Sequence, residues 1–203
     1  MVPKDRKRIA ILASGSGTNA QRLIEFFKHS AKAEVVLVAS DQPKAGVLQR
    51  AWDLGVMSFL FNGKELREGR VLKELQELKI DLIVLAGFLR LIPIDMVRAF
   101  EGRIVNIHPA LLPKYGGKGM YGEHVHKAVI GAGDKVSGIT IHLVNENYDE
   151  GEHLLQVECP VIEGDTPEGL AERIHALEHA HFPKAVEALI EKMTVQAGDR
   201  ELR

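Results

Sequence analysis

Several features that mark specialised classes of protein are scarce in this sequence. It has one cysteine, Cys159, which excludes an intramolecular disulfide and favours a reducing compartment. No apolar run approaches the roughly 20 residues that a membrane-spanning helix needs. The apolar stretch Ile9–Ala13, which follows a basic start, is too short for the core of a signal peptide. We therefore expect a cytoplasmic protein that does not enter a membrane.

An excess of charge of either sign is also missing. The chain has 26 Lys and Arg residues against 28 Asp and Glu residues, a formal net charge of −2. Such a balance creates no general attraction to nucleic acid or to an anionic membrane, so neither is an expected partner. Any anion that binds must be held by a local site. With 45% hydrophobic residues the chain has enough apolar material for an ordinary globular core.

Short apolar runs rich in β-branched residues alternate with longer amphipathic stretches. This alternation predicts one doubly wound, mostly parallel sheet with helices on both faces, an α/β fold of the Rossmann-like kind. The expected strands are Ile9–Ala13, Val35–Ala39, Leu82–Ala86, Ile104–Ile107, Ile139–Leu143 and Leu154–Val157. The expected helices are Asn19–His29, Val47–Leu54, Lys64–Leu78, Pro93–Phe100 and a long one from about Pro167 to Lys192. No repeat or linker divides the chain, so we predict a single domain over residues 1–203 with a frayed polar tail from about residue 194.

A glycine-rich turn follows the first predicted strand. Ser14-Gly-Ser-Gly-Thr-Asn19 leads directly into a helix, where small residues and the helix N-terminus suit a phosphate group. It lacks the Gly-Lys-Ser/Thr of a Walker A loop. Gly15-x-Gly17-x-x-Ala20, with Asp41 at the distance of a ribose-binding acid, also fits a dinucleotide fingerprint. A nicotinamide-dependent dehydrogenase and a tight turn without a ligand therefore stay open at this point.

Two polar residues interrupt the end of a predicted core strand. Asn106 and His108 are two positions apart in Ile104-Val-Asn-Ile-His-Pro109, so their side chains share one face of the strand. An amide donor beside an imidazole could stabilise an oxyanion on a substrate carbonyl and manage its protons. Taken alone, such a pair is more often structural than catalytic.

The residues around this pair resemble the folate-dependent formyltransferases. The family hallmark is Asn-x-His-Pro-Ser/Ala-Leu-Leu-Pro, followed by Gly-x-Thr/Ser-x-His and an Asp before a glycine. This sequence has Asn106-Ile-His-Pro-Ala-Leu-Leu-Pro113, then Gly138-Ile-Thr-Ile-His142, then Asp149 separated from Gly151 by Glu150. The resemblance runs from about Ile9 to Pro183.

The family includes enzymes that act on phosphoribosylglycinamide, on methionyl-tRNA or on formyltetrahydrofolate itself. The glycine turn resembles a ribonucleotide phosphate loop, Leu85-Ala-Gly-Phe-Leu-Arg90 resembles a folate-side loop, and a chain of 203 residues has no room for the extra domains expected of the other two branches. The resemblance therefore implies transfer of a formyl group from 10-formyltetrahydrofolate to the amine of phosphoribosylglycinamide, in purine biosynthesis. A formyltransferase for sugar nucleotides and a non-catalytic folate-binding module are the alternatives. The sequence does not predict the oligomeric state.

The resemblance also assigns roles to individual residues. His108 and Asn106 would be catalytic, and Asp149 would raise the pKa of His108 above its reference of about 6.5. The ribonucleotide would bind through Gly17, Thr18, Asn19, Pro109 and Glu178. The folate would bind through Lys64, Leu89, Arg90, Leu91, Ile92, Asn106, Asn145 and Asp149. The segment from Gly116 to Gly122 is longer than in the shorter bacterial members. The family pattern therefore does not determine which of its positions His124 and His126 occupy.

One further motif suggests a metal. His175-Ala-Leu-Glu178-His179 satisfies the His-x-x-Glu-His pattern of a zinc-protease class. Such a site needs a third protein ligand, and few candidates follow on or after the same helix. We expect no metal cofactor, and we interpret the stretch as a polar face of the last helix.

Overall fold

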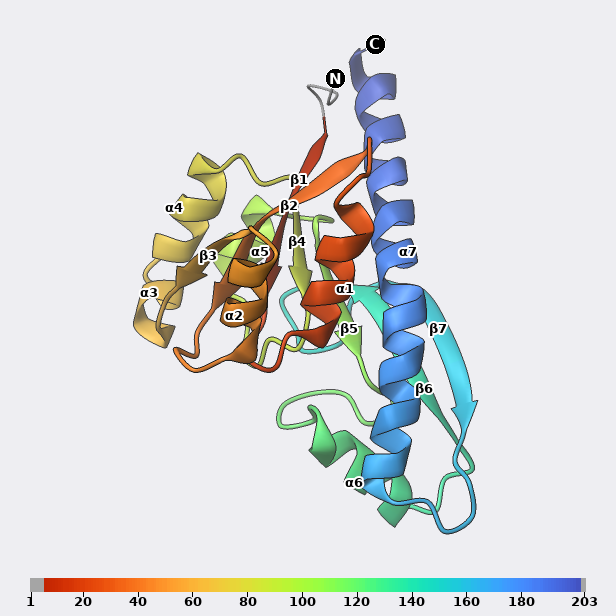
Figure 1. The fold of residues 1–203 in the computed structure, drawn as a ribbon. Helices are drawn as coiled ribbons and strands as arrows, with labels where there is room; N and C mark the ends of the chain where they lie inside the picture. The colour runs from red at the N-terminus through yellow and green to blue at the C-terminus, as the bar shows by residue number, and fades with distance from the viewer. Residues whose placement is uncertain (1–5, 202–203) are drawn as a thin grey trace.

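A computed structural model describes residues 6–201, and its centre is one seven-stranded sheet (Figure 1). The strand order is β3-β2-β1-β4-β5-β6-β7. The first five strands in this order run parallel to one another, whereas β6 and β7 are antiparallel to their neighbours. The strands are β1 (Lys7–Leu12), β2 (Ala33–Ser40), β3 (Met57–Leu60), β4 (Leu82–Leu85), β5 (Ile104–His108), β6 (Val136–Leu143) and β7 (His153–Pro160).

Helices cover both faces of this sheet, as predicted. One face packs against α1 (Thr18–Phe27), α2 (Gly46–Asp53), α6 (Glu123–Gly131) and α7 (Pro167–Glu201). The other packs against α3 (Gly63–Arg67), α4 (Arg70–Glu77) and α5 (Ile94–Ala99). Strand β1 explains why two cores form, because successive side chains point to opposite faces of a strand. Ile9 and Ile11 join the first core, whereas Ala10 and Leu12 join the second.

The structure differs from the predicted elements at a few places. Strand β3 and helix α6 were not predicted. The expected helix over residues 64–78 is two helices, because Gly69 between them has a φ of +82°, a left-handed conformation that interrupts an α-helix. Helix α7 continues to Glu201, beyond the predicted end near Lys192 and through the region where we expected a frayed tail.

The last two strands position the site. Strand β6 pairs antiparallel with β5, and the register puts Asn106 opposite His142 and His108 opposite Thr140. Residues directly opposite each other in such a pair lie close enough for their side chains to touch. The second half of the predicted motif is thereby brought beside the first half. None of the helices within residues 6–201 is both long enough and apolar enough to span a membrane.

Candidate active site

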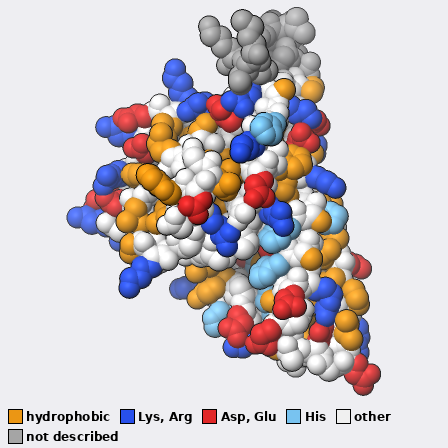
Figure 2. Space-filling model, in the orientation of Figure 1, with side chains coloured by type: hydrophobic (Ala, Val, Ile, Leu, Met, Phe, Trp, Pro, Cys, Tyr) orange, Lys and Arg blue, Asp and Glu red, His pale blue; other side chains and the backbone are white. Residues whose placement is uncertain are grey.

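A cleft of about 660 Å³ opens where β1, β4 and β5 end, which is the edge at which ligands bind in open α/β sheets. Figure 2 shows histidine side chains gathered near the middle of this face, and acidic and basic side chains interspersed over the rest of it. The cleft is lined by the glycine turn (15–19), the loop after β4 (85–92), the end of β5 (106–109), residues 117–122, and the segment 142–149 without 143, 145 and 146. His126, His175 and Glu178 complete the lining.

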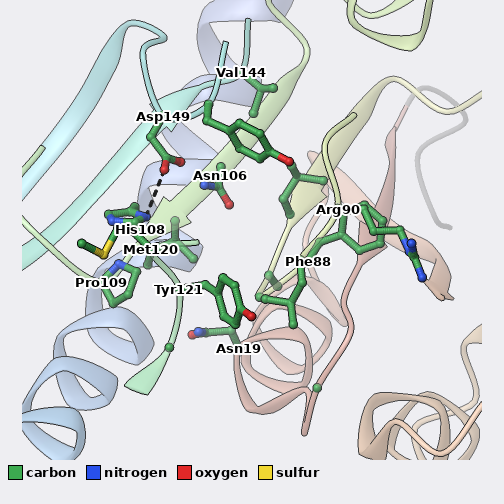
Figure 3. Close-up of a pocket in the computed structure, with 18 of the residues that line it drawn as sticks. Asn19, Phe88, Arg90, Asn106, His108, Pro109, Met120, Tyr121, Val144 and Asp149 are labelled. Atoms are coloured by element: carbon green, nitrogen blue, oxygen red, sulfur yellow. Dashed lines mark ion pairs between the residues drawn. The ribbon is translucent and has the colours of Figure 1, made fainter. Parts of the chain in front are cut away.

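Four polar side chains meet at one end of the cleft. Asn106 and His108 project from the end of β5, and Asp149 lies beside them on the same side of the cleft (Figure 3). The carboxylate of Asp149 lies 3.7 Å from Nδ1 of His108 and 3.6 Å from Nε2 of His142. Nδ2 of Asn106 lies 3.1 Å from the same Nε2 of His142. The structure therefore brings together the three residues that the sequence predicted as catalytic.

The hydrogen bonds of the two imidazoles define their tautomers. Nδ1 of His142 lies 2.9 Å from the carbonyl oxygen of Leu143, which can only accept, so Nδ1 carries the proton. Nε2 of His142 faces both the amide of Asn106 and the carboxylate of Asp149. In His108, Nε2 donates to the carbonyl of Tyr115 at 2.8 Å, so Nδ1 is the atom that takes up a proton facing Asp149. Asp149 is thus placed to stabilise the imidazolium form.

Burial decides the protonation of His108. Its side chain is 4% exposed, and this desolvation lowers its pKa below the ordinary value of a histidine. Asp149 acts in the opposite direction, as the sequence predicted, but its charge only partly offsets the effect of burial. The expectation of a pKa above the reference of about 6.5 is therefore wrong. In the protein without substrate, His108 is largely neutral at neutral pH.

Two residues that contact His108 have left-handed backbone. Tyr115 has a φ of +58° and Asp149 a φ of +57°, a region that costs a residue with a Cβ about 1 kcal/mol or more. The backbone N–H of Gly117 donates to Asp149 at 2.9 Å and holds the carboxylate in the cleft. Burial acts to raise the pKa of Asp149, but the polar contact with His142, the nearby His108 and this N–H together lower it. Asp149 is consequently ionised at neutral pH.

The glycine turn presents unpaired backbone donors to the cleft. Within residues 6–201, the N–H groups from Gly15 to Asn19 have no hydrogen-bond acceptor, and no side chain caps α1. Such a run of N–H groups at a helix N-terminus is suited to a phosphate. Gly17 has a φ of +81°, and a Cβ there would come within 2.6 Å of Val47. Packing therefore requires a glycine at position 17, whether or not a ligand binds there. A Cβ on Gly15, in contrast, would meet no atom within 4 Å.

A buried carboxylate closes the cleft on the side of α7. Glu178 is 6% exposed, and its Oε2 accepts a hydrogen bond from Nδ2 of Asn19 at 2.8 Å. Burial raises the pKa of Glu178, and the bond from Asn19 opposes that shift. His126 of α6 is also buried, and desolvation together with His175 lowers its pKa to about 4. Oδ1 of Asn19 and Nδ1 of His126 have no hydrogen-bond partner among the described residues, so polar groups at this end are free for a ligand.

The residues predicted to bind folate divide into two sets. Leu89, Arg90, Leu91 and Ile92 line the cleft opposite His108, although the guanidinium of Arg90 is directed away from its centre (Figure 3). Lys64 does not line the cleft; its side chain is 73% exposed and faces Glu68 at 3.8 Å. Asn145 also lies outside the lining, because its side chain accepts from the N–H of Asn147 in a local turn.

His142 and Thr140 belong to the second half of the predicted motif, and neither was predicted to have a role. His142 contacts both Asn106 and Asp149. The hydroxyl of buried Thr140 donates to the carbonyl of Ala110 and accepts from the N–H of Leu112, which fixes the chain just after His108. Their spacing at i and i+2 on a predicted strand was the signal, since it puts both side chains on the face that Asn106 and His108 share.

The His-x-x-Glu-His pattern is arranged differently from a metal centre. His175 and Glu178 line the cleft, and Glu178 is engaged by Asn19. Among residues 6–195, no group of three or more His, Cys, Asp or Glu side chains is arranged to hold a metal ion.

Comparison with known proteins agrees with this geometry. The sequence pattern of the formyl transferase family matches residues 7–186. The chain is 41% identical over 200 residues to a chloroplastic phosphoribosylglycinamide formyltransferase of Vigna unguiculata, covering 96% of this chain and 64% of that protein. It is 41% identical over 198 residues to the trifunctional purine biosynthetic protein adenosine-3 of Drosophila melanogaster, covering 94% of this chain and only 14% of that protein.

A solved structure shares both the fold and much of the sequence. Glycinamide ribonucleotide transformylase 1 from Symbiobacterium toebii superposes with a TM-score of 0.86 at 36% identity, over 94% of this chain and 90% of that one. The dehydrogenase alternative loses its support, because Asp41, its expected ribose-binding residue, is buried and hydrogen-bonded within the protein. The match over residues 7–186, together with the site at the end of β5, means that the chain belongs to the formyl transferase family.

Proposed function

We propose that this protein transfers the formyl group of 10-formyltetrahydrofolate to the primary amine of phosphoribosylglycinamide. The observation that carries the proposal is the cluster of Asn106, His108 and Asp149 in a cleft between an anion-binding turn and the loop after β4. The names of the relatives, which include phosphoribosylglycinamide formyltransferases, support the same substrate. The cytoplasmic setting, suggested by the single cysteine, stays a prediction.

The two substrates would enter from opposite sides of the cluster. The phosphate of the ribonucleotide would bind the free N–H groups of Gly15 to Asn19, and its amine would lie toward Glu178. Pro109, at the cleft wall after His108, would border the ribonucleotide. The folate would lie along residues 89–92 of the cleft, and its formyl group would lie near Asn106.

The chemistry required of the protein is then modest. The neutral amine attacks the formyl carbon and the carbonyl oxygen becomes an oxyanion. The amine nitrogen then loses a proton, the bond from the carbon to the folate nitrogen breaks, and the folate nitrogen leaves with a proton, so that no net proton is consumed. The amide of Asn106, held by His142, would donate to that oxyanion. His108 would supply the second donor and the proton, since Asp149 and the developing negative charge both favour its imidazolium form. To reach the substrate, its Nε2 proton must leave the carbonyl of Tyr115.

A direct assay tests the function. The protein should form N-formyl product from 10-formyltetrahydrofolate and phosphoribosylglycinamide, and NAD(H) binding should be absent. The matched control is an amino sugar nucleotide offered with the same folate. No product from phosphoribosylglycinamide would refute the proposal, and product only from the sugar nucleotide would reassign the substrate within the family.

Variants of two residues test the proposed roles. His108→Ala and Asn106→Ala should each lower kcat at least ~10²-fold, the usual scale for losing an acid catalyst or an oxyanion donor. Thermal unfolding and circular dichroism should remain close to those of the original protein. Unchanged turnover in either variant would remove the role given to that residue.

A further inference from the structure

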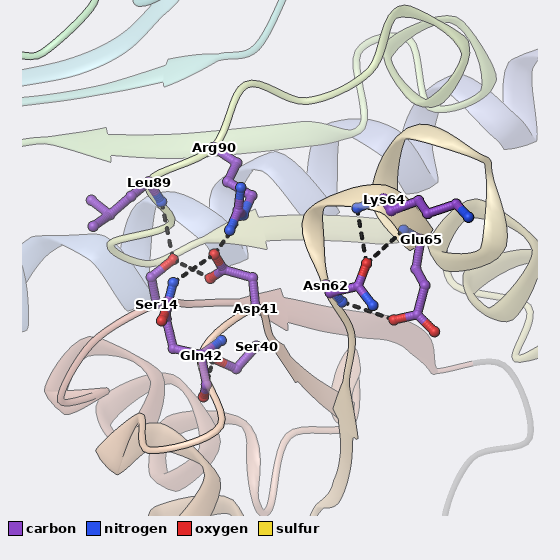
Figure 4. A network of polar contacts seen from close by, with 9 residues as sticks. All are labelled: Ser14, Ser40, Asp41, Gln42, Asn62, Lys64, Glu65, Leu89 and Arg90. Carbon is purple, nitrogen blue, oxygen red and sulfur yellow. Dashed lines mark hydrogen bonds and ion pairs between the residues drawn. The ribbon is translucent and has the colours of Figure 1, made fainter.

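A polar network behind the cleft connects three loops that follow adjacent strands. Ser14 follows β1, Asp41 follows β2, and Leu89 and Arg90 follow β4 (Figure 4). Oδ1 of Asp41 accepts from the hydroxyl of Ser14 at 2.6 Å, and Oδ2 accepts from Nε of Arg90 at 2.6 Å. The hydroxyl of Ser14 accepts in turn from the N–H of Leu89 at 3.2 Å. Neither Ser14 nor Asp41 lines the cleft.

The network has one consistent direction. A carboxylate only accepts, so the hydroxyl of Ser14 must donate to Asp41 and is left to accept from Leu89. The side chain of Asp41 is 1% exposed. Burial acts to raise its pKa, but the hydrogen bonds from Ser14, Arg90 and Gln42 outweigh that effect and lower it. The carboxylate of Asp41 is therefore ionised, and both of its oxygens and the hydroxyl of Ser14 have hydrogen-bond partners.

Residues 15–19 of the glycine turn, which carry the free N–H groups, are anchored outside this network. The carbonyl of Gly15 accepts from the N–H of Val47 at 3.2 Å, and the carbonyl of Ser16 accepts from Nε of Arg50 at 2.9 Å. Both bonds attach the turn to the start and middle of α2. Removing Ser14 or Asp41 side-chain bonds would leave these anchors in place.

The loop after β4 has one backbone bond outside this network, from the N–H of Ser14 to the carbonyl of Gly87 at 3.0 Å, and that bond holds only the first residue of the loop. Within residues 6–201, the hydrogen bonds that connect residues 87–92 to other segments all go to Ser14 or Asp41. Its apolar anchors are at its ends, where Phe88 packs on Phe61 and Ile92 is buried. Between them, Leu89 and Leu91 are 49% and 47% exposed. The middle of the loop is therefore ordered mainly by the network.

We propose that Ser14 and Asp41 are positioning residues that preorganise the loop 87–92 for the folate cosubstrate. Without them, the loop would become ordered only when the folate binds. The loss of conformational entropy in that step would weaken binding of the folate. The ribonucleotide side would be unaffected, because α2 holds it. The inference rests on the proposed function for the identity of the cosubstrate.

The test separates the two substrates. In Ser14→Ala and in Asp41→Asn, KM for the formyl folate should rise about tenfold, the scale expected from ordering a few exposed residues. KM for phosphoribosylglycinamide should stay within about twofold, and kcat at saturation within about threefold. The matched control is Arg173→Ala, which breaks the ion pair with Asp165, a carboxylate that is 8% exposed and does not border the cleft. That variant should lose stability while both KM values stay unchanged.

The outcomes are distinguishable. An unchanged folate KM, or an equal rise of both KM values, would overturn the positioning role. If Asp41→Asn does not fold, Ser14→Ala carries the test, because it removes the link to Leu89 without burying a new amide. Calorimetric titration with tetrahydrofolate needs no turnover. A protein without formyltransferase activity would refute the proposed function, whereas a folate affinity that is equal in the original protein and in Ser14→Ala would refute only the network's role.

Discussion

At the level of single residues, the chemistry depends on how two opposed effects act on His108. Burial favours the neutral imidazole, and the carboxylate of Asp149 at 3.7 Å favours the charged one. The result is a pKa below the ordinary value, which keeps a lone pair on Nδ1 before the reaction. When an oxyanion forms nearby, a further negative charge shifts the balance toward imidazolium. The arrangement allows the proton affinity of His108 to rise at the moment when the proton is needed.

Replacing Asp149 with Asn should therefore lower the pKa of His108 further. The substitution retains the shape of the side chain and removes the charge that favours the imidazolium form. We expect kcat at neutral pH to fall about 10- to 100-fold, because fewer molecules carry the required proton. Lower pH should restore activity only in part, since the substrate amine becomes protonated as well.

NMR titration of His108 in the two proteins measures this directly. The control is His29, an exposed residue just beyond α1 that does not line the cleft. A His108 titration that is identical in the original protein and in Asp149→Asn would show that the two side chains are not coupled, and the role of Asp149 would have to be withdrawn.

Sequence reasoning identified the central residues but not their partners. Asn106 and His108 stood out because two polar residues share one face at the end of an apolar strand. Lys64 and Asn145 were predicted at the folate side, yet neither lines the cleft. Both assignments came from the family resemblance, which does not determine where a short exposed helix such as α3 or a local turn such as the one at Asn145 directs its side chains. His142 required the β5–β6 register, which the alternation in residues 139–143 indicated only indirectly.

At the level of elements, two glycines of the turn between β1 and α1 have different roles: Gly17 is needed for packing, and Gly15 for ligand binding. Gly17→Ala should lower the free energy of unfolding by at least about 1–2 kcal/mol, because it combines a positive φ with a Cβ 2.6 Å from Val47. Gly15→Ala should leave stability unchanged, since its Cβ would project into open space. It should nevertheless raise KM for the ribonucleotide about tenfold by blocking close approach of the phosphate to the backbone.

Chemical denaturation and steady-state kinetics of the two variants provide the comparison. The folate KM is the internal control in both proteins. A destabilised Gly15→Ala, or a Gly15→Ala protein with an unchanged ribonucleotide KM, would contradict the assignment of this turn to the phosphate.

Strand β3 and helix α6 were not predicted, because neither has a long periodic pattern of buried residues. Strand β3 is a short edge strand in which most side chains are exposed, so its sequence carries no burial pattern. Helix α6 follows a glycine-rich segment, and its apolar stripe spans little more than two turns. The long strands and helices that form the two cores were predicted because their periodicity reflects burial.

Contact between α6 and α7 should make stability depend on pH. His126 has a pKa of about 4 in the folded protein, against about 6.5 in an unfolded chain. As pH falls from 6.5 toward 4, the unfolded chain binds a proton that the folded protein excludes, so the free energy of unfolding decreases. Below pH 4 both states are protonated and the contribution stops changing. In the middle of the window it amounts to about 1 kcal/mol per pH unit.

The non-titrating variant His126→Asn tests this contribution. Between pH 4.5 and 6, the free energy of unfolding of this variant should change less steeply with pH, by an amount that corresponds to about one proton. The remaining slope would come from other groups, since burial also lowers the pKa values of His108 and His179. Urea unfolding at several pH values measures the slope. Identical slopes in the two proteins would mean that His126 is not buried as a neutral group.

At the level of the whole molecule, the cleft is built from parts that are distant in the sequence. The glycine turn lies near residue 15, the catalytic strand near residue 106, and Glu178 in the last helix, joined to the turn by Asn19. One core cluster contains residues of β1, α1, β5, β6 and α7 (Figure 1). The parallel strands and the antiparallel pair β6–β7 therefore share both a sheet and a core. A site assembled in this way exists only when both ends of the chain are folded together.

This arrangement leads to a prediction about folding, which also tests the single domain expected from the sequence. Thermal unfolding should occur in one transition that is the same by circular dichroism and by calorimetry. Phosphoribosylglycinamide at 100 times its Kd should stabilise the folded state by about 2.7 kcal/mol and raise Tm by roughly 5–10 °C. Because the ligand would contact both the turn and Glu178, hydrogen exchange should slow at the start of α1 and in α7 alike. Two separate transitions, or protection confined to the first hundred residues, would mean that β6, β7 and α7 form a unit that the ribonucleotide does not need.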